Sequence, residues 1–96
     1  MRILLDQNVP VGVRIFLDRQ HAVSTAAREG WAALTDAGLL AAAEARGFDI
    51  LVTCDQSMPY QQNMTGRAIK LRVLWTNSWL DLTLQHERVV AIILDD

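Results

Sequence analysis

Two short apolar runs, each of which stops at an aspartate, constrain the fold of this chain most strongly. Residues 1–5 run into Asp6, and residues 50–54 run into Asp55. Aliphatic runs of this kind are typical of strands that are buried on both faces of a parallel sheet. In open α/β sheets, ligands bind outside the carboxyl ends of the strands. We therefore expect Asp6 and Asp55 to lie together at one edge of a parallel sheet.

The rest of the chain alternates strands with helices. We expect strands at residues 2–5, 21–25, 48–54 and 68–75, helices at residues 10–20, 36–46 and 80–94, and a loop with a short helix at residues 55–66. Such alternation predicts right-handed crossovers and a mostly parallel sheet. The fold class that follows is α/β: a small three-layer α/β/α, Rossmann-like domain with a four-stranded sheet.

The order of the strands follows from their polarity. The first and third strands are the most apolar, so we place them at the centre and predict the order 2-1-3-4. In the fourth strand, Lys70 and Arg72 alternate with apolar residues. A strand with one solvent-exposed face and two cations is typical of a sheet edge. In this order, Asp6 and Asp55 flank the crevice where the connections leave in opposite directions.

The composition limits the size and the partners of the protein. The 96 residues, of which 51% are hydrophobic, predict one domain over residues 1–96. A chain this short buries a small share of its surface, so a homodimer is a secondary expectation. With a net charge of −2, contact with nucleic acid would need a local basic patch, such as Arg67, Lys70 and Arg72. The single cysteine, the lack of a signal-peptide pattern and the lack of about 20 consecutive apolar residues indicate a cytoplasmic protein without a membrane span.

Several uses are open to carboxylates at a crevice. They bind a divalent cation, share a proton, or cap the start of a helix. Asp6 lies just before a predicted helix, and Asp55 lies before a polar loop where an Asx turn would suit it. Asp36 opens a helix whose start belongs at the same edge, where either Thr35 or Asp36 suits the N-cap. These local roles stay open beside a metal site formed by Asp6, Asp55 and Asp36.

Neutral polar residues accompany these acids. Asn8 follows Asp6 closely, and Gln61 and Gln62 belong to an amide-rich loop after Asp55. Amides beside an acidic crevice suit contacts to a phosphate or a nucleotide, as does the cation Arg67. Glu44 lies about two turns into its helix, so we expect it to point away from this edge.

Longer segments resemble a known family. The opening MRILLDQNVP looks like the LLDxNxP start of the small PIN-like proteins that are grouped as a domain of unknown function. The likeness continues through GWAALTDAGLL, AAAEARGFDILVTCDQSM, YQQNMTGR and VLWTNSW, and so covers nearly the whole chain. These proteins resemble the PIN nucleases, including VapC-type toxins, which use strand-end acids to bind Mg²⁺ or Mn²⁺ and to hydrolyse RNA.

The resemblance implies roles for individual residues. Asp6 matches the first strand-end acid of the PIN pattern, and Asp55 matches a later one. Asp36 falls where the small family often has Asn or Asp. The glutamate that full-length PIN nucleases carry on a helix has no match in this chain.

Three hypotheses follow for the function. The first is a PIN-like, metal-dependent ribonuclease or a protein derived from one, which would act as the toxin of a toxin–antitoxin pair, with RNA as substrate and an antitoxin-like protein as partner. Asp6, Asp55 and Asp36 would hold Mg²⁺ or Mn²⁺ for catalysis, and the substrate contacts would come from Asn8, Gln61, Gln62 and Arg67. The second is a binding module that has kept the fold without catalysis. The third is a receiver-like domain that accepts a phosphoryl group on Asp55.

Overall fold

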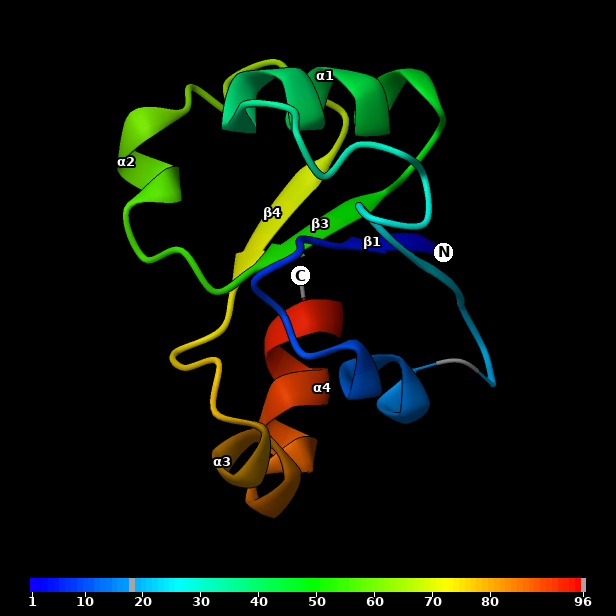
Figure 1. Ribbon diagram of the computed structural model, residues 1–96, viewed down its shortest axis with the longest axis vertical. Helices are drawn as coiled ribbons and strands as arrows, with labels where there is room; N and C mark the ends of the chain where they lie inside the picture. Colours follow the sequence, from blue (N-terminus) through cyan, green and yellow to red (C-terminus); the bar gives the residue numbers. More distant parts are fainter. Residues whose placement is uncertain (18, 96) are drawn as a thin grey trace.

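Four parallel strands form the centre of the computed structural model, which describes residues 1–17 and 19–95 (Figure 1). The strands are β1 (Arg2–Leu5), β2 (Ala22–Thr25), β3 (Ile50–Thr53) and β4 (Lys70–Val73). They lie in the order β2-β1-β3-β4, and all three neighbouring pairs are parallel. The predicted strand order and the position of β4 at an edge are therefore confirmed.

Helices cover both faces of this sheet. The helical elements are η1 (Val11–Phe16), α1 (Asp36–Ala45), α2 (Met58–Gln61), α3 (Trp79–Leu84) and α4 (His86–Leu94). In Figure 1, α1 and α2 lie above the sheet, whereas η1, α3 and α4 lie below it. The three-layer α/β/α architecture is confirmed. Within the described residues, no helix has both the length and the apolar character needed to span a membrane.

Two hydrophobic cores sandwich the sheet because successive side chains of a strand point to opposite faces. Ile3 and Leu5 of β1 belong to the core shared with η1, α3 and α4. Leu4, between them, belongs to the core shared with α1 and α2. All three side chains are fully buried. This two-sided burial explains why the strand has no polar alternation.

The helix at residues 36–46 forms as expected. Thr35 is its N-cap: the Thr35 hydroxyl accepts a hydrogen bond from the Gly38 N–H at 3.1 Å. The helix ends before Gly47, whose φ of 79° lies in the left-handed region that glycine adopts without strain. Capping by Thr35 leaves the side chain of Asp36 available for other contacts.

The predicted helix at residues 10–20 is wrong in type and length. A 3₁₀ helix spans Val11–Phe16 instead, and the Val13 N–H donates to the Pro10 carbonyl at 3.0 Å. Glycine and β-branched residues disfavour a regular α-helix in this segment. The ring of Trp79 also packs so closely on Gly12 that an added Cβ would lie 2.5 Å from it. Residue 18, in the rest of the predicted helix, lies outside the described residues.

The predicted helix at residues 80–94 is also wrong, because it is two helices. Gln85 separates α3 from α4 with φ −120° and ψ 40°, outside the helical region. The break allows α3 to pack against η1, where Trp79 stacks on Phe16 with ring centroids 5.7 Å apart. Meanwhile α4 runs beneath the sheet and buries Val89 and Ile93.

Candidate functional site

The register of β1 and β3 brings the two strand-end aspartates to one edge of the sheet. Leu5 pairs with Val52, and the Asp6 N–H donates to the Val52 carbonyl at 2.8 Å. Asp6 therefore lies beside Thr53, two residues before Asp55. The Asp6 side chain is mostly buried, with an exposed fraction of 9%. The structure places both acids at the carboxyl edge, as the sequence predicts.

The fully buried hydroxyl of Thr53 links these residues. It donates to Asp6 Oδ2 at 2.9 Å. It accepts from Asn8 Nδ2 at 3.2 Å and from the Asp55 N–H at 3.1 Å. One donated and two accepted bonds use the full capacity of a hydroxyl. Sequence reasoning missed Thr53, although a hydroxyl inside an apolar strand requires a polar partner.

Asn8 joins the loop after β1 to the end of β3. Its Oδ1 accepts from the Cys54 N–H at 2.9 Å, while its Nδ2 reaches Thr53. Both ends of the amide are thus engaged by protein atoms next to Asp6. This places Asn8 as a support for the acid rather than as a side chain that reaches outward to substrate.

Asp55 takes the Asx-turn role that the sequence left open. Its Oδ1 accepts from the Ser57 N–H at 2.9 Å and from the Ser57 hydroxyl at 2.7 Å. The hydrogen bond from the Ser57 hydroxyl, and to a lesser extent the one from the Ser57 N–H, lower the pKa of Asp55 below its usual value. Asp55 therefore carries a negative charge at neutral pH, and its carboxylate is held in a fixed direction at the start of α2.

Asp36 brings a third carboxylate to the same edge from the first turn of α1. Burial raises the pKa of Asp36 above its usual value, and the charges of Asp6 and Asp55 raise it further. At Asp55, the Ser57 hydrogen bonds outweigh the effect of burial, which would raise the pKa. Three acids from three separate segments therefore interact through their charges.

These acids do not form a closed metal cage. Within residues 1–17 and 19–95, no three His, Cys, Asp or Glu side chains are arranged to hold a metal ion. This finding agrees with the raised pKa of Asp36, because charges interact over many ångströms, whereas Mg²⁺ or Ca²⁺ needs oxygens at about 2.0–2.6 Å. Both oxygens of Asp6 already accept protein hydrogen bonds, Oδ2 from Thr53 and Oδ1 from the Gln7 N–H at 2.8 Å.

Cys54, between Thr53 and Asp55, has an inert thiol. Its Sγ donates to the Thr76 carbonyl at 3.3 Å. Burial, and next the charge of Asp6, raise the pKa of Cys54 to about 11. The thiol therefore stays protonated at neutral pH and offers neither a nucleophile nor a thiolate ligand.

The predicted substrate residues separate into two groups. Gln61 ends α2 and is exposed, and Gln62 follows it half-buried, so both lie on the segment that begins beside Asp55. Arg67 instead precedes β4, at the amino edge of the sheet. There its Nη1 lies 3.3 Å from Glu44 Oε1, and Glu44 Oε2 accepts from the Ala68 N–H at 2.7 Å. The structure does not bring Arg67 to the acids, and Glu44 points away from them as expected.

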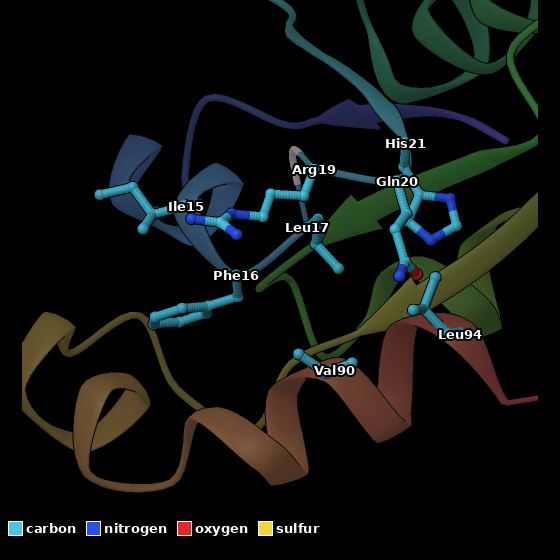
Figure 2. A pocket seen from close by; sticks show the side chains of 8 residues that line it. All are labelled: Ile15, Phe16, Leu17, Arg19, Gln20, His21, Val90 and Leu94. Atoms are coloured by element: carbon cyan, nitrogen blue, oxygen red, sulfur yellow. The ribbon is translucent and has the colours of Figure 1, made fainter.

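A pocket of about 280 Å³ opens elsewhere on the protein, and none of the three acids lines it (Figure 2). It opens between the end of η1, the segment before β2 and α4, and it is lined by Ile15, Phe16, Leu17, Arg19, Gln20, His21, Val90 and Leu94. His21 Nδ1 lies 3.3 Å from the amino-terminal nitrogen of Met1. The pocket is therefore not part of the candidate site.

No family model, curated protein or solved structure matches this chain. The resemblance to PIN-like proteins stays a prediction from the sequence motifs.

Proposed function

We propose that this protein is a PIN-like, metal-dependent ribonuclease, or a protein derived from one, that binds Mg²⁺ or Mn²⁺ at the carboxyl edge of its sheet. The observation that carries the proposal is the gathering of three acids at one edge of the sheet, where burial, and then repulsion from the charges of Asp6 and Asp55, raise the pKa of Asp36. A cation between carboxylates removes such repulsion. The resemblance of the sequence to PIN-like proteins supports the same site.

The donor set fits a hard divalent cation. All three side chains supply carboxylate oxygens, which Mg²⁺ and Mn²⁺ prefer. Mg²⁺ commonly keeps several water ligands and binds only one or two carboxylates. An open arrangement of acids therefore suits it better than it suits Zn²⁺, whose sites in proteins usually include His nitrogen or Cys sulfur.

In this proposal Asp6 and Asp55 hold the ion, and Asp36 helps through a water molecule. A bound Mg²⁺ or Mn²⁺ would acidify a water molecule and stabilise charge on a phosphodiester. Thr53 and Asn8 keep Asp6 in place, whereas Ser57 orients Asp55. The ionised state of Asp55 at neutral pH suits this task.

Contacts to RNA would come from the segment after Asp55. Gln61 and Gln62 offer amides on the segment that follows Asp55, and Tyr60, with an exposed fraction of 91%, offers a ring on which a base can stack. The proposal extends to the toxin half of a toxin–antitoxin pair in the cytoplasm, with an antitoxin-like protein as partner.

Calorimetric titration with Mn²⁺ tests the metal site. We expect saturable binding to the wild type and loss of that binding in the double variant Asp6→Asn with Asp55→Asn. Glu87→Gln is the matched control because it removes one exposed carboxylate on α4, away from the site. Equal binding in all three proteins, or none in any of them, would refute the site.

Cleavage of a mixed RNA pool tests the activity. The wild type should cut RNA with Mn²⁺ and not with EDTA, and Asp6→Asn should be inactive while Glu87→Gln keeps full activity. Cleavage that survives Asp6→Asn would place the activity elsewhere.

A binding module without catalysis is the second candidate. Glu44, in the last turn of α1, binds Arg67 and the Ala68 N–H at the opposite edge, so this helix adds no further acid to the site. Binding of Mn²⁺ without any cleavage of RNA would favour this function.

A further inference from the structure

Large apolar side chains are exposed on two neighbouring elements, η1 and α3. Ile15 of η1 and Leu80 and Leu84 of α3 have exposed fractions of 66% to 72%. Trp79, at the start of α3, is exposed as well and joins the two elements, because its ring stacks on Phe16 of η1. We refer to Ile15, Trp79, Leu80 and Leu84 as the apolar patch. Contiguous apolar surface of this kind marks an interaction site, whereas single exposed apolar residues do not.

The helix α3 packs on the core through a single residue. Of its six residues, Leu82 is buried and the other five are exposed. An α-helix turns by about 100° per residue, so Leu80 and Leu84 point to the side opposite Leu82. These two leucines therefore face the solvent, and contact with another protein surface would remove their apolar area from water.

Arg14 lies at one end of the apolar patch. A 3₁₀ helix has three residues per turn, so Gly12 and Ile15 form one row along η1, and Arg14 belongs to another row. Trp79 packs on Gly12 and stacks on Phe16, so α3 lies beside the rows of these two residues. Arg14, in the remaining row, therefore points away from α3, beyond Ile15.

Asp81 lies at the other end of the apolar patch. Trp79 and Asp81 are two residues apart on α3 and point to nearly opposite sides of the helix, about 200° apart. Because Trp79 faces η1, Asp81 faces away from it. Within residues 1–17 and 19–95, neither the Arg14 guanidinium nor the Asp81 carboxylate forms a hydrogen bond or an ion pair. The apolar patch therefore has an unpaired cation at one end and an unpaired anion at the other.

We propose that two copies of the chain form a symmetric dimer through the apolar patch. A two-fold rotation about an axis near Trp79 reverses the order of residues across the surface. It brings Arg14 of each copy to Asp81 of the partner subunit and lays the exposed leucines of α3 on Ile15 of the partner subunit. The proposal uses none of the acids at the carboxyl edge and does not depend on nuclease activity.

The charge pattern favours a second copy over other occupants. A surface with opposite charges at its two ends complements itself after a two-fold rotation, as an isologous interface requires. An anionic membrane would attract Arg14 but repel Asp81, on a chain whose net charge is −2. The position of Trp79 at the centre, with charged residues at the rim, is also the usual arrangement of a binding hot spot.

Sedimentation equilibrium of the full chain at several concentrations tests the dimer. Since η1 and α3 have six residues each, the interface is small, and we expect a dissociation constant on the order of 10 µM. Leu84→Glu places a charge in the apolar patch and should weaken the dimer about tenfold or more. Leu34→Glu is the matched control, because it changes an exposed leucine just before α1, the helix on the other face of the sheet. It should dimerise like the wild type.

Charge reversal tests how the two copies pair. Arg14→Asp and Asp81→Arg each place like charges at both contacts between the subunits, so each should weaken the dimer about tenfold or more. The double variant restores opposite charges and should dimerise like the wild type. Circular dichroism checks that each variant folds. Because Asp81 is exposed, its reversal tests the interface even where Leu84→Glu does not fold.

Several results would overturn the proposal. One is a wild type that sediments as a monomer at every concentration, and another is equal dimerisation of Leu84→Glu and Leu34→Glu. A double charge reversal that dimerises no better than the single reversals would exclude this pairing of the two copies. Growth of the mass beyond a dimer would also contradict it, since a two-fold contact closes on itself.

Discussion

The hydroxyl of Thr53 donates to Asp6 Oδ2 at 2.9 Å, and this buried bond connects the end of β3 to the end of β1. The same hydroxyl accepts from Asn8 Nδ2 and from the Asp55 N–H. A single side chain thus holds together the backbone and the carboxylate of the candidate site. Its removal should affect stability and metal binding alike.

Thr53→Val keeps the shape of the side chain and removes the hydroxyl. It leaves a buried carboxylate oxygen, an amide group and a backbone N–H without a partner, so the free energy of unfolding should fall by about 3 kcal/mol or more. Thr53→Ser keeps the hydroxyl and removes one methyl group, at a cost of about 1 kcal/mol. Urea unfolding measures both values. Equal losses would show that the hydroxyl bonds are unimportant.

The strand order could be predicted from the sequence because burial and polarity differ among the strands. Unbroken apolar runs required two covered faces, and the alternation at Lys70 and Arg72 required an edge. The position of Asp6 and Asp55 at one edge followed directly, since parallel strands end on the same side. Asp36 joined them because its helix starts at that edge.

Other features depend on contacts between distant segments, which local sequence does not reveal. The 3₁₀ form of η1 goes together with the close packing of Trp79 on Gly12, 67 positions later. Arg67 was placed near the acids because it lies close to Asp55 in sequence. The chain instead returns to the amino edge of the sheet before β4, and Arg67 forms an ion pair with Glu44 there. The role of the Thr53 hydroxyl was not predicted because the neighbouring residues of its strand are apolar.

The charge of Asp36 should make stability depend on pH. Burial and the charges of Asp6 and Asp55 raise the pKa of Asp36 above 3.8, so the folded protein holds this proton more tightly than the unfolded chain does. The stability from this group is complete below 3.8 and is lost as the pH rises through the raised pKa. Asp36→Asn should therefore unfold at higher urea concentration than the wild type at pH 7, with the difference shrinking as the pH falls through that range.

A control variant and a measurement with Mn²⁺ extend the comparison of Asp36→Asn with the wild type. Glu87→Gln, which removes an exposed charge on α4, should show no such pH dependence. Saturating Mn²⁺ should stabilise the wild type at pH 7 more than it stabilises Asp36→Asn. If Asp36→Asn were less stable than the wild type at pH 7, the proposed repulsion would be contradicted.

The raised pKa of Cys54 should protect its thiol from alkylation. Relative to an ordinary thiol with a pKa of 9.0, a pKa of about 11 leaves roughly one hundredth of the thiolate at pH 8. Iodoacetamide should thus modify the folded protein on the order of 100-fold more slowly than the urea-unfolded chain, as followed by mass spectrometry. Asp6→Asn removes one cause of the shift and should speed the reaction. Equal rates in the folded and unfolded protein would contradict this account.

The contact between Gly12 and Trp79 gives a test of the packing between η1 and α3. An added Cβ at residue 12 would lie 2.5 Å from Trp79 Cη2 and 2.8 Å from Cζ2, so Gly12→Ala forces the ring away from its stack on Phe16. Overpacking of this kind costs about 1–3 kcal/mol in the free energy of unfolding. In a Trp79→Leu background the methyl group has room, so the same substitution should cost much less. Urea unfolding of the four proteins gives the coupling energy, and an equal cost in both backgrounds would show that the ring does not restrict residue 12.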